Sequence, residues 1–434
     1  MISPFEERYR TEINDLFTEE KKYRNWMLVE YALAKAHAQL GDIPKEAPEK
    51  IRKAIDKVKP ARILEIEAEI HHDLMAMVRA LTEQAGDAGK YVHYGATSYD
   101  IEDTATALTF LEALDVVEDR AQEMRQVLKK LALANKKTVC IGRTHGQHAV
   151  PTTYGMKFAL YYQELGRNLD RLAAARERIA VGKMSGAVGT GATFGKNKKR
   201  IEELVMKELG LKPAAITTQV VQRDRHAEVM FVLALFAATM EKIAKELRNL
   251  QRTELLEISE PFSSKQVGSS TMPQKRNPHK SERVCSLARL VRSHVSVAME
   301  NIALEHERDL TNSANERVIF HESFIAVDYM MKQLIAILDG LVFYPENIRR
   351  NLELTNGLIM AERLMIYLTA QGMGRQEAHE RVRQAAQFAF AEKKHLKDIV
   401  VQQKLISKAE AEKLFDYTTY IGDAVRIVED AVKD

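Results

Sequence analysis

Apolar residues recur every three or four positions through several unusually long segments of this chain, and few folds can accommodate such segments. In residues 227–256, for example, Val229, Leu233 and Phe236 share one face, with charged residues between them. This spacing predicts a long amphipathic helix. The same pattern recurs over residues 104–133, 282–304 and 320–341. Strand-like alternation is scarce, so we expect an all-α fold with a central bundle of long helices.

Residues 231–238 are apolar on every side of the predicted helix. A helix without a polar face has to be buried all round. One chain offers little surface with which to cover several such helices. The sequence therefore predicts that subunits associate through their long helices.

The chain is long enough for more than one domain, because 434 residues exceed a single typical core. The polar stretch at residues 95–103 and the sequence Phe343-Tyr344-Pro345 suggest two boundaries, since proline there would end a helix. We expect an N-terminal helical domain (1–95), a central long-helix domain (96–342) and a C-terminal helical domain (343–434).

Charge and cysteine content exclude several classes of protein. A net charge of +3 is small for this length, so no general affinity for nucleic acid is expected. The two cysteines, Cys140 and Cys285, do not make a secreted disulfide framework. The charged N-terminus does not resemble a signal peptide, and no apolar run reaches the roughly 20 residues of a membrane span. We therefore expect a cytoplasmic protein without a membrane partner.

Residues 268–278, Gly-Ser-Ser-Thr-Met-Pro-Gln-Lys-Arg-Asn-Pro, have a composition that no regular helix or strand would favour. Two prolines stiffen the segment, so we expect a shaped loop between helices rather than a flexible one. Its hydroxyl groups could transfer protons, and its Gly-Ser-Ser amides could bind an oxyanion. Lys275 and Arg276 could hold a carboxylate or a phosphate.

Four other polar clusters interrupt the apolar periodicity. They lie at residues 71–73, 93–100, 142–151 and 306–317. In the second cluster, Thr97 and Ser98 are favoured N-cap residues before a predicted helix, where free amides attract anions. Considered alone, the first two clusters could be plain helix caps, and the fourth could be a solvated charged face.

The third cluster contains two histidines, His145 and His148, in a Gly- and Pro-flanked segment. We expect His145 to lie at a junction between a loop and a helix, where it could act as a general acid. The spacing of the two histidines also occurs in zinc sites. No third ligand follows in a metal pattern, however, so no metal site is predicted.

Together these clusters resemble the fumarase/aspartase superfamily, whose hallmark loop Gly-Ser-Ser-x-Met-Pro-x-Lys-x-Asn-Pro is matched in full by residues 268–278. Within it the chain is most similar to the adenylosuccinate lyase family. The motifs that carry the closer resemblance are Glu7-Arg8-Tyr9, His72-Asp73, Thr97-Ser98, Gly142-Arg143-Thr144-His145-Gly146, Thr218-Gln219, Gln222-Arg223-Asp224-Arg225-His226 and His306-Glu307-Arg308-Asp309. They follow the expected order up to about residue 317, and the remainder is similar only in length and helicity.

The resemblance implies β-elimination of fumarate from adenylosuccinate, giving AMP, and from the succinyl-aminoimidazole-carboxamide ribonucleotide of purine synthesis. It also implies a homotetramer with a tetrameric helical core, whose active sites are each shared by three subunits. No cofactor is implied. The substrate is a small purine nucleotide, and the loop at 268–278 would be a lid that closes over it.

By this resemblance Ser269 is the general base and His145 is the general acid, while His72 supports His145 or binds phosphate. Lys275 and Asn277 would hold the carboxylate of the fumarate moiety. By the same resemblance, Thr97 and Ser98 would bind a carboxylate, and Gln219 would bind the succinyl group. The phosphate and ribose would be bound by Arg8, Tyr9, Arg308, Ser313 and Arg317. The remaining candidates for substrate binding are His71, Asp73 and Ser270.

Two departures from the family pattern are visible. His71 stands where the family often has arginine, and residues 313–317 read Ser-Ala-Asn-Glu-Arg where the family often has Ser-Ser-Ala-Glu-Arg. Ser313 and Arg317 are unaffected. Two alternatives stay open: a sister lyase acting on argininosuccinate, aspartate, malate or a carboxymuconate, and a non-catalytic helical scaffold that kept the fold.

Overall fold

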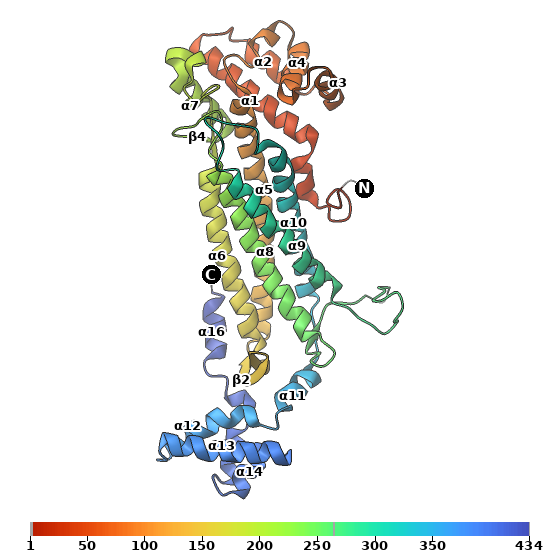
Figure 1. The fold of residues 1–434 in the computed structure, drawn as a ribbon, viewed down its shortest axis with the longest axis vertical. Coiled ribbons are helices and arrows are strands. Elements are labelled where there is room, and N and C mark those ends of the chain that lie inside the picture. The colour runs from red at the N-terminus through yellow and green to blue at the C-terminus, as the bar shows by residue number, and fades with distance from the viewer. Residues whose placement is uncertain (1–2, 264, 434) are drawn as a thin grey trace. The chain divides into compact units, whose positions relative to one another are not determined.

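The computed structural model describes residues 3–263 and 265–433, which form two compact units (Figure 1). Unit 1 comprises Met1–Ala121, Asn168–Ala238 and Ser286–Lys332. Unit 2 comprises Gln122–Arg167, Thr239–Cys285 and Gln333–Asp434. Each unit combines three separate stretches of the chain, so this division does not test the boundaries predicted at residues 95 and 342. The three-domain division therefore stays a prediction.

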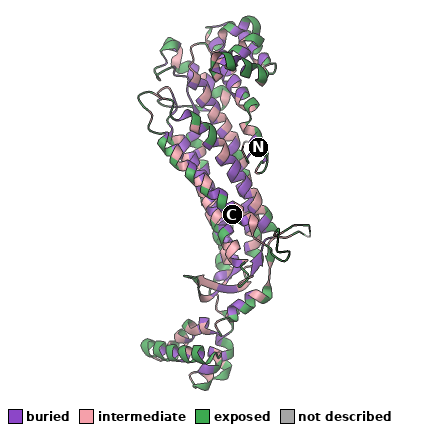
Figure 2. Ribbon diagram, turned by 45° about the vertical axis from the view of Figure 1, so that its right-hand side comes forward, coloured by how far each residue is buried: buried purple, intermediate pink, exposed green. Residues whose placement is uncertain are grey.

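Five long helices contribute residues to both units, and the all-α prediction is confirmed. They are α5 (Ser98–Ala134), α6 (Tyr154–Ile179), α8 (Asp224–Leu250), α9 (His279–Glu300) and α10 (Ser313–Asp339). Figure 2 shows buried residues running along them. The observed helices begin three to seven residues before the apolar periodicity does, because their first turns carry polar residues rather than core residues.

The remaining helices of unit 1 cover its N-terminal part. They are α1 (Glu19–Leu40), α2 (Ala47–Ile55), α3 (Pro60–Ile70), α4 (Asp73–Ala85) and α7 (Lys198–Leu209), with 3-10 helices η1 (Glu12–Phe17), η2 (Gly86–Tyr91) and η3 (Ala192–Asn197). Pro48 and Pro60 occupy first-turn positions, where the missing amide proton costs nothing. Trp26, Leu33 and Leu81 belong to one buried apolar cluster that joins these helices.

The C-terminal helices lie entirely in unit 2. They are α11 (Pro345–Glu353), α12 (Ala361–Ala370), α13 (Arg375–Glu392), α14 (Leu396–Gln402), α15 (Lys408–Leu414) and α16 (Ala424–Ala431), with η4 (Leu358–Met360) and η5 (Tyr417–Thr419). A second apolar cluster, which includes Leu364, Leu396 and Val400, holds them together. No helix in the described ranges is long and apolar enough to cross a membrane.

Three short strand pairs complete the described structure. Antiparallel β1 (Val139–Thr144) and β2 (Gln147–Thr153) form a hairpin, β3 (Val181–Gly182) and β4 (Lys212–Pro213) pair in parallel, and β5 (Ile258–Ser259) pairs antiparallel with β6 (Val342–Phe343). The hairpin corrects one expectation. His145 was predicted at a junction between a loop and a helix, but it lies at the hairpin tip, and α6 begins nine residues later.

Candidate active site

The loop at residues 268–278 is shaped around the hydroxyl of Ser269. The backbone amides of Thr271 and Met272 both point at this hydroxyl, with nitrogen to Oγ distances of 3.3 and 3.1 Å. Two amide donors directed at one oxygen stabilise negative charge on that oxygen. The geometry therefore favours the alkoxide that a serine base requires.

Contacts between its two ends close this loop into a ring. Asn277 Nδ2 donates to the Gly268 carbonyl at 3.1 Å. A Cβ at position 268 would lie 1.9 Å from the carbonyl oxygen of Lys275, so only glycine allows this close approach. Outside the ring, Gln251 Nε2 donates to the Arg276 carbonyl at 3.1 Å. The expectation of a shaped loop without helix or strand agrees with these contacts.

His145 lies at the exposed tip of the β1–β2 hairpin, in unit 2 as the loop does. Thr144 pairs with Gln147, which leaves His145 and Gly146 as a two-residue turn with φ values of 55° and 74°. Such turns strongly prefer Asn-Gly, because both central residues need positive φ. A histidine held in this conformation is strained, and strain of this kind gathers at functional sites.

A buried carboxylate braces the base of the hairpin. Glu257 accepts hydrogen bonds from Arg143 on β1, Tyr154 at the start of α6 and Asn351 on α11. The Glu257 side chain is 1% exposed, so its charge is compensated by these donors rather than by water. Burial first and the Arg143 charge second lower the pKa of His148 on β2, which leaves that imidazole neutral at pH 7.

The histidine pair of unit 1 joins two helices. His71 ends α3 in a left-handed conformation, and His72 caps α4 by accepting the amide proton of Met75 on its Nδ1 at 3.4 Å. Asp73 Oδ2 accepts from Arg317 Nη2 at 2.6 Å. Burial alone would raise the pKa of Asp73, but the hydrogen bond and charge of Arg317 hold it below its ordinary value. Two predicted binding residues, 244 positions apart, thus meet.

Several other predicted binding residues of unit 1 surround Tyr99. The Arg308 guanidinium lies 3.6 Å from the centre of the Tyr99 ring and donates from Nη1 to Gln219 Oε1 at 3.0 Å. Tyr99 and Ser313 also line the same pocket. The Thr97 amide donates to Asp100 at 2.9 Å, one turn into α5, and thereby starts the helix at Ser98.

Arg8 and Tyr9 lie elsewhere on unit 1. The Tyr9 ring packs against Tyr329 at 5.1 Å between centroids. Tyr329 is 16 residues beyond Ser313 on α10, which corresponds to about 24 Å along a helix. One chain therefore does not bring Arg8 and Tyr9 to the cluster around Ser313 and Arg317.

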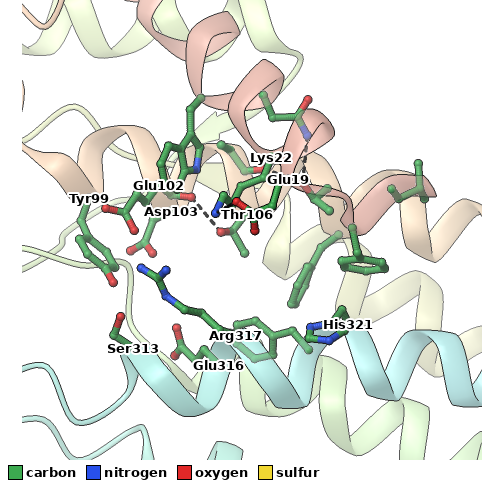
Figure 3. Close-up of a pocket in the computed structure, with 18 of the residues that line it drawn as sticks. Glu19, Lys22, Tyr99, Glu102, Asp103, Thr106, Ser313, Glu316, Arg317 and His321 are labelled. Atoms are coloured by element: carbon green, nitrogen blue, oxygen red, sulfur yellow. Dashed lines mark hydrogen bonds and ion pairs between the residues drawn. The ribbon is translucent and has the colours of Figure 1, made fainter. Parts of the chain in front are cut away.

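A pocket of about 380 Å³ opens beside this cluster, between α1, α5 and α10 (Figure 3). Tyr99, Glu102, Asp103 and Ser313 gather at one end of the close-up, and His321 lies at the other. Burial, Asp73 and Asp103, in that order, raise the pKa of Glu102 to about 8. A carboxylic acid that keeps its proton at neutral pH can donate a hydrogen bond into the pocket.

The raised pKa of Glu102 predicts how stability depends on pH. The folded state holds this proton more tightly than the unfolded chain, where the ordinary value is 4.5. Its stabilising contribution is complete below that value and is lost as pH rises toward about 8. The thermal unfolding midpoints of the wild type and of Glu102→Gln, measured from about pH 5 to about pH 8, report this loss of stability. We expect the variant to lose less stability over this range, and parallel curves would contradict the assignment.

Known protein families and full-length relatives match this chain. Residues 7–292 match the family described as "Lyase", and residues 357–431 match "Adenylosuccinate lyase C-terminus". The adenylosuccinate lyase of Pyrococcus horikoshii is 54% identical over 100% of this chain and 97% of its own length. The adenylosuccinate lyase of Methanocaldococcus jannaschii is 50% identical over 100% of this chain and 96% of its own length. The chain belongs to the adenylosuccinate lyase family.

Solved structures of enzymes with other names share this fold. The crystal structure of 3-carboxy-cis,cis-muconate lactonizing enzyme from Pseudomonas putida superposes with a TM-score of 0.91 at 31% identity, over 99% of this chain and 98% of that one. The resemblance inferred from the motifs is therefore confirmed at the level of both family and fold. The individual roles of the candidate residues stay predictions.

The motifs do not reveal how several residues that shape the candidate site pair with one another. Lys183 and Asp100 form a pair that is completely buried, and Asp100 also accepts amide protons from Thr97, Ser185 and Gly186. Asp100 is visible in the sequence as an N-cap residue type in the cluster at residues 93–100, but its pairing with Lys183 is not. Arg223 stands in the motif Gln222-Arg223-Asp224-Arg225-His226 without an assigned role, whereas Glu102 and Glu257 have no comparable local signal. Among the described residues, no three His, Cys, Asp or Glu side chains are grouped so as to hold a metal ion.

Proposed function

We propose that the chain is a carbon–nitrogen lyase that eliminates fumarate from adenylosuccinate, giving AMP, and from the succinyl-aminoimidazole-carboxamide ribonucleotide of purine biosynthesis. The observation that carries this proposal is 54% identity, over the whole chain, to an adenylosuccinate lyase. The hallmark loop at residues 268–278 is intact within that match.

The first step of the proposed reaction removes a proton from the carbon beside a carboxylate of the succinyl group. That carbon is weakly acidic, so the base must be strong and the resulting dianion must be stabilised. Ser269 is the proposed base, and the Thr271 and Met272 amides that point at its hydroxyl support this role. Lys275 and Asn277 are proposed to hold the adjoining carboxylate.

In the second step the carbon–nitrogen bond breaks, and the departing amine takes a proton. His145 is the proposed donor, which its strained position at an exposed hairpin tip supports. We propose that Thr97, Ser98 and Gln219 bind the succinyl group, while Arg8, Tyr9, Arg308, Ser313 and Arg317 bind phosphate and ribose. His71, His72, Asp73 and Ser270 complete the proposed site.

We also propose a homotetramer in which each active site combines residues of three subunits. The separation of Arg8 and Tyr9 from Ser313 within one chain supports this, because another subunit could supply the missing contacts. Phe231 and Val318, which are 51% and 47% exposed on long helices, would be covered in such an assembly. Light scattering after size-exclusion chromatography should report four chains of 49.3 kDa per particle, and a monodisperse monomer would contradict the proposal.

A substrate panel tests the proposed specificity. Purified protein is assayed with adenylosuccinate, argininosuccinate, aspartate, malate and 3-carboxy-cis,cis-muconate under identical conditions. We expect adenylosuccinate to give by far the highest kcat/KM, and a preference for any other substrate would refute the proposed specificity.

We also propose a cytosolic location. The free, buried thiols of Cys140 and Cys285 support it, and cell fractionation can test it.

A further inference from the structure

A buried ionic cluster joins three segments of unit 1. Arg223, just before α8, donates from Nη1 to Asp103 of α5 at 2.9 Å and from Nε to Glu316 of α10 at 2.9 Å. Its Nη2 reaches the second Glu316 oxygen at 3.2 Å, so the pairing with Glu316 is bidentate. The three residues are 4%, 3% and 9% exposed in chain order. This fork geometry is specific to arginine and fixes direction as well as distance.

The same cluster immobilises the backbone that precedes α8. Asp103 Oδ2 accepts the Val221 amide at 2.7 Å, and Arg223 Nη1 donates to the Val221 carbonyl at 2.8 Å. Both backbone groups of Val221 are therefore satisfied by the cluster. Since Val221 lies two residues after Gln219, the cluster limits where the Gln219 side chain can reach.

Two members of the cluster, Glu316 and Arg223, lie close to proposed substrate-binding residues. Glu316 lies in the first turn of α10 between Ser313 and Arg317. The Tyr99 ring, which lines the same pocket as Ser313, has the Arg308 guanidinium at 3.6 Å and the Arg223 guanidinium at 5.8 Å. The cluster thus connects the first turn of α10, which is proposed to bind phosphate, to the segment that carries Gln219. Arg223 lies in the wall of the pocket but is only 3% exposed.

We propose that Arg223 is a positioning residue for nucleotide binding, which holds Ser313 and Arg317 of α10 in a fixed relation to Gln219 and to the start of α5. The inference rests on the proposed function, because it assigns phosphate to Ser313 and Arg317. The phosphate and the succinyl group are at opposite ends of one substrate, so their binding groups must keep a fixed separation to engage both. Arg223 supplies that constraint without touching the substrate.

Arg223→Lys tests the proposal, since lysine keeps the charge and loses the fork. Loss of interactions that hold the ground state and the transition state equally raises KM and leaves kcat unchanged. We therefore expect the KM for adenylosuccinate to rise by roughly tenfold or more while kcat stays within about threefold of wild type. The dissociation constant of AMP, measured by calorimetry, should also rise because Arg223 holds Ser313 and Arg317, but it should rise less because AMP lacks the succinyl group. A second variant, Glu316→Gln, should also raise the KM for adenylosuccinate and the dissociation constant of AMP. It tests the proposal even where Arg223→Lys does not fold.

Arg120→Lys is the matched control. Arg120 Nε donates to the buried Asp328 at 3.0 Å, so this pair also joins α5 to α10, but it lies several turns from Ser98 and Ser313. This control should lower the thermal unfolding midpoint and leave KM unchanged. A purely structural Arg223 would behave like Arg120, with lower stability and unaltered KM and AMP affinity, and that result would overturn the proposal. Because AMP binding is measured without turnover, a wild type that binds AMP but does not cleave adenylosuccinate would refute the proposed function alone.

Discussion

Replacement of Ser269 by alanine should lower kcat with adenylosuccinate by roughly 10²–10⁴-fold, the range that a positioned acid or base contributes. The reason is local: the Thr271 and Met272 amides point at the Ser269 oxygen, and no other atom takes its place in the variant. The loop is exposed, so the change should leave the helical circular dichroism and the unfolding midpoint unaltered. Steady-state kinetics on the purified variant measure the loss.

The matched control for this variant is Ser263→Ala. Ser263 lies in the same exposed segment, and its backbone carbonyl, which alanine keeps, accepts the Gln266 amide. This control should retain wild-type kcat. Equal activity in Ser269→Ala and Ser263→Ala would refute the assignment of Ser269 as the base and would leave the rest of the proposed reaction without a proton acceptor.

Replacement of Lys183 by methionine should destabilise the protein by about 3–5 kcal/mol, because it leaves a buried charge without its partner. Lys183 and Asp100 are both 0% exposed, and Asp100 also accepts the Thr97, Ser185 and Gly186 amides. An unpaired buried carboxylate takes up a proton more readily. The loss of stability should therefore be smaller near pH 5 than near pH 8. Chemical unfolding at both pH values measures it.

The surface pair Lys130–Asp339 provides the control. Its ammonium and carboxylate lie 3.2 Å apart, and the side chains are 74% and 60% exposed. Exposed pairs of this kind contribute less than about 1 kcal/mol, so Lys130→Met should be nearly neutral. A similar small effect in Lys183→Met would mean that the buried pair does not stabilise the fold.

Much of the fold could be predicted because short stretches of sequence are enough to identify its long helices and its loop. The 3.6-residue period identifies α5, α8, α9 and α10, and the prolines and glycine of residues 268–278 identify a loop. The β1–β2 hairpin could not be recognised in the same way. Glycine at 142 and 146 and proline at 151 interrupt its alternation, and the turn uses histidine where Asn-Gly would have signalled it.

The buried charges of the candidate site could not be predicted for a different reason. Asp100 and Lys183 are 83 positions apart, and Arg223 is 120 positions from Asp103 and 93 from Glu316. Nothing in the local sequence of a charged residue indicates whether it will be solvated or paired, since tertiary packing decides that. The motifs indicated which residue types belong to the reaction, and the structure was needed to find those that hold them in place.

The most direct test of the central claim is the conversion of adenylosuccinate itself. Purified protein is incubated with this substrate, and AMP and fumarate are separated and quantified by chromatography over time. The proposed elimination predicts that both products appear in equal amounts, at rates that follow the protein concentration. Absence of both products, under conditions in which a control adenylosuccinate lyase is active, would contradict it.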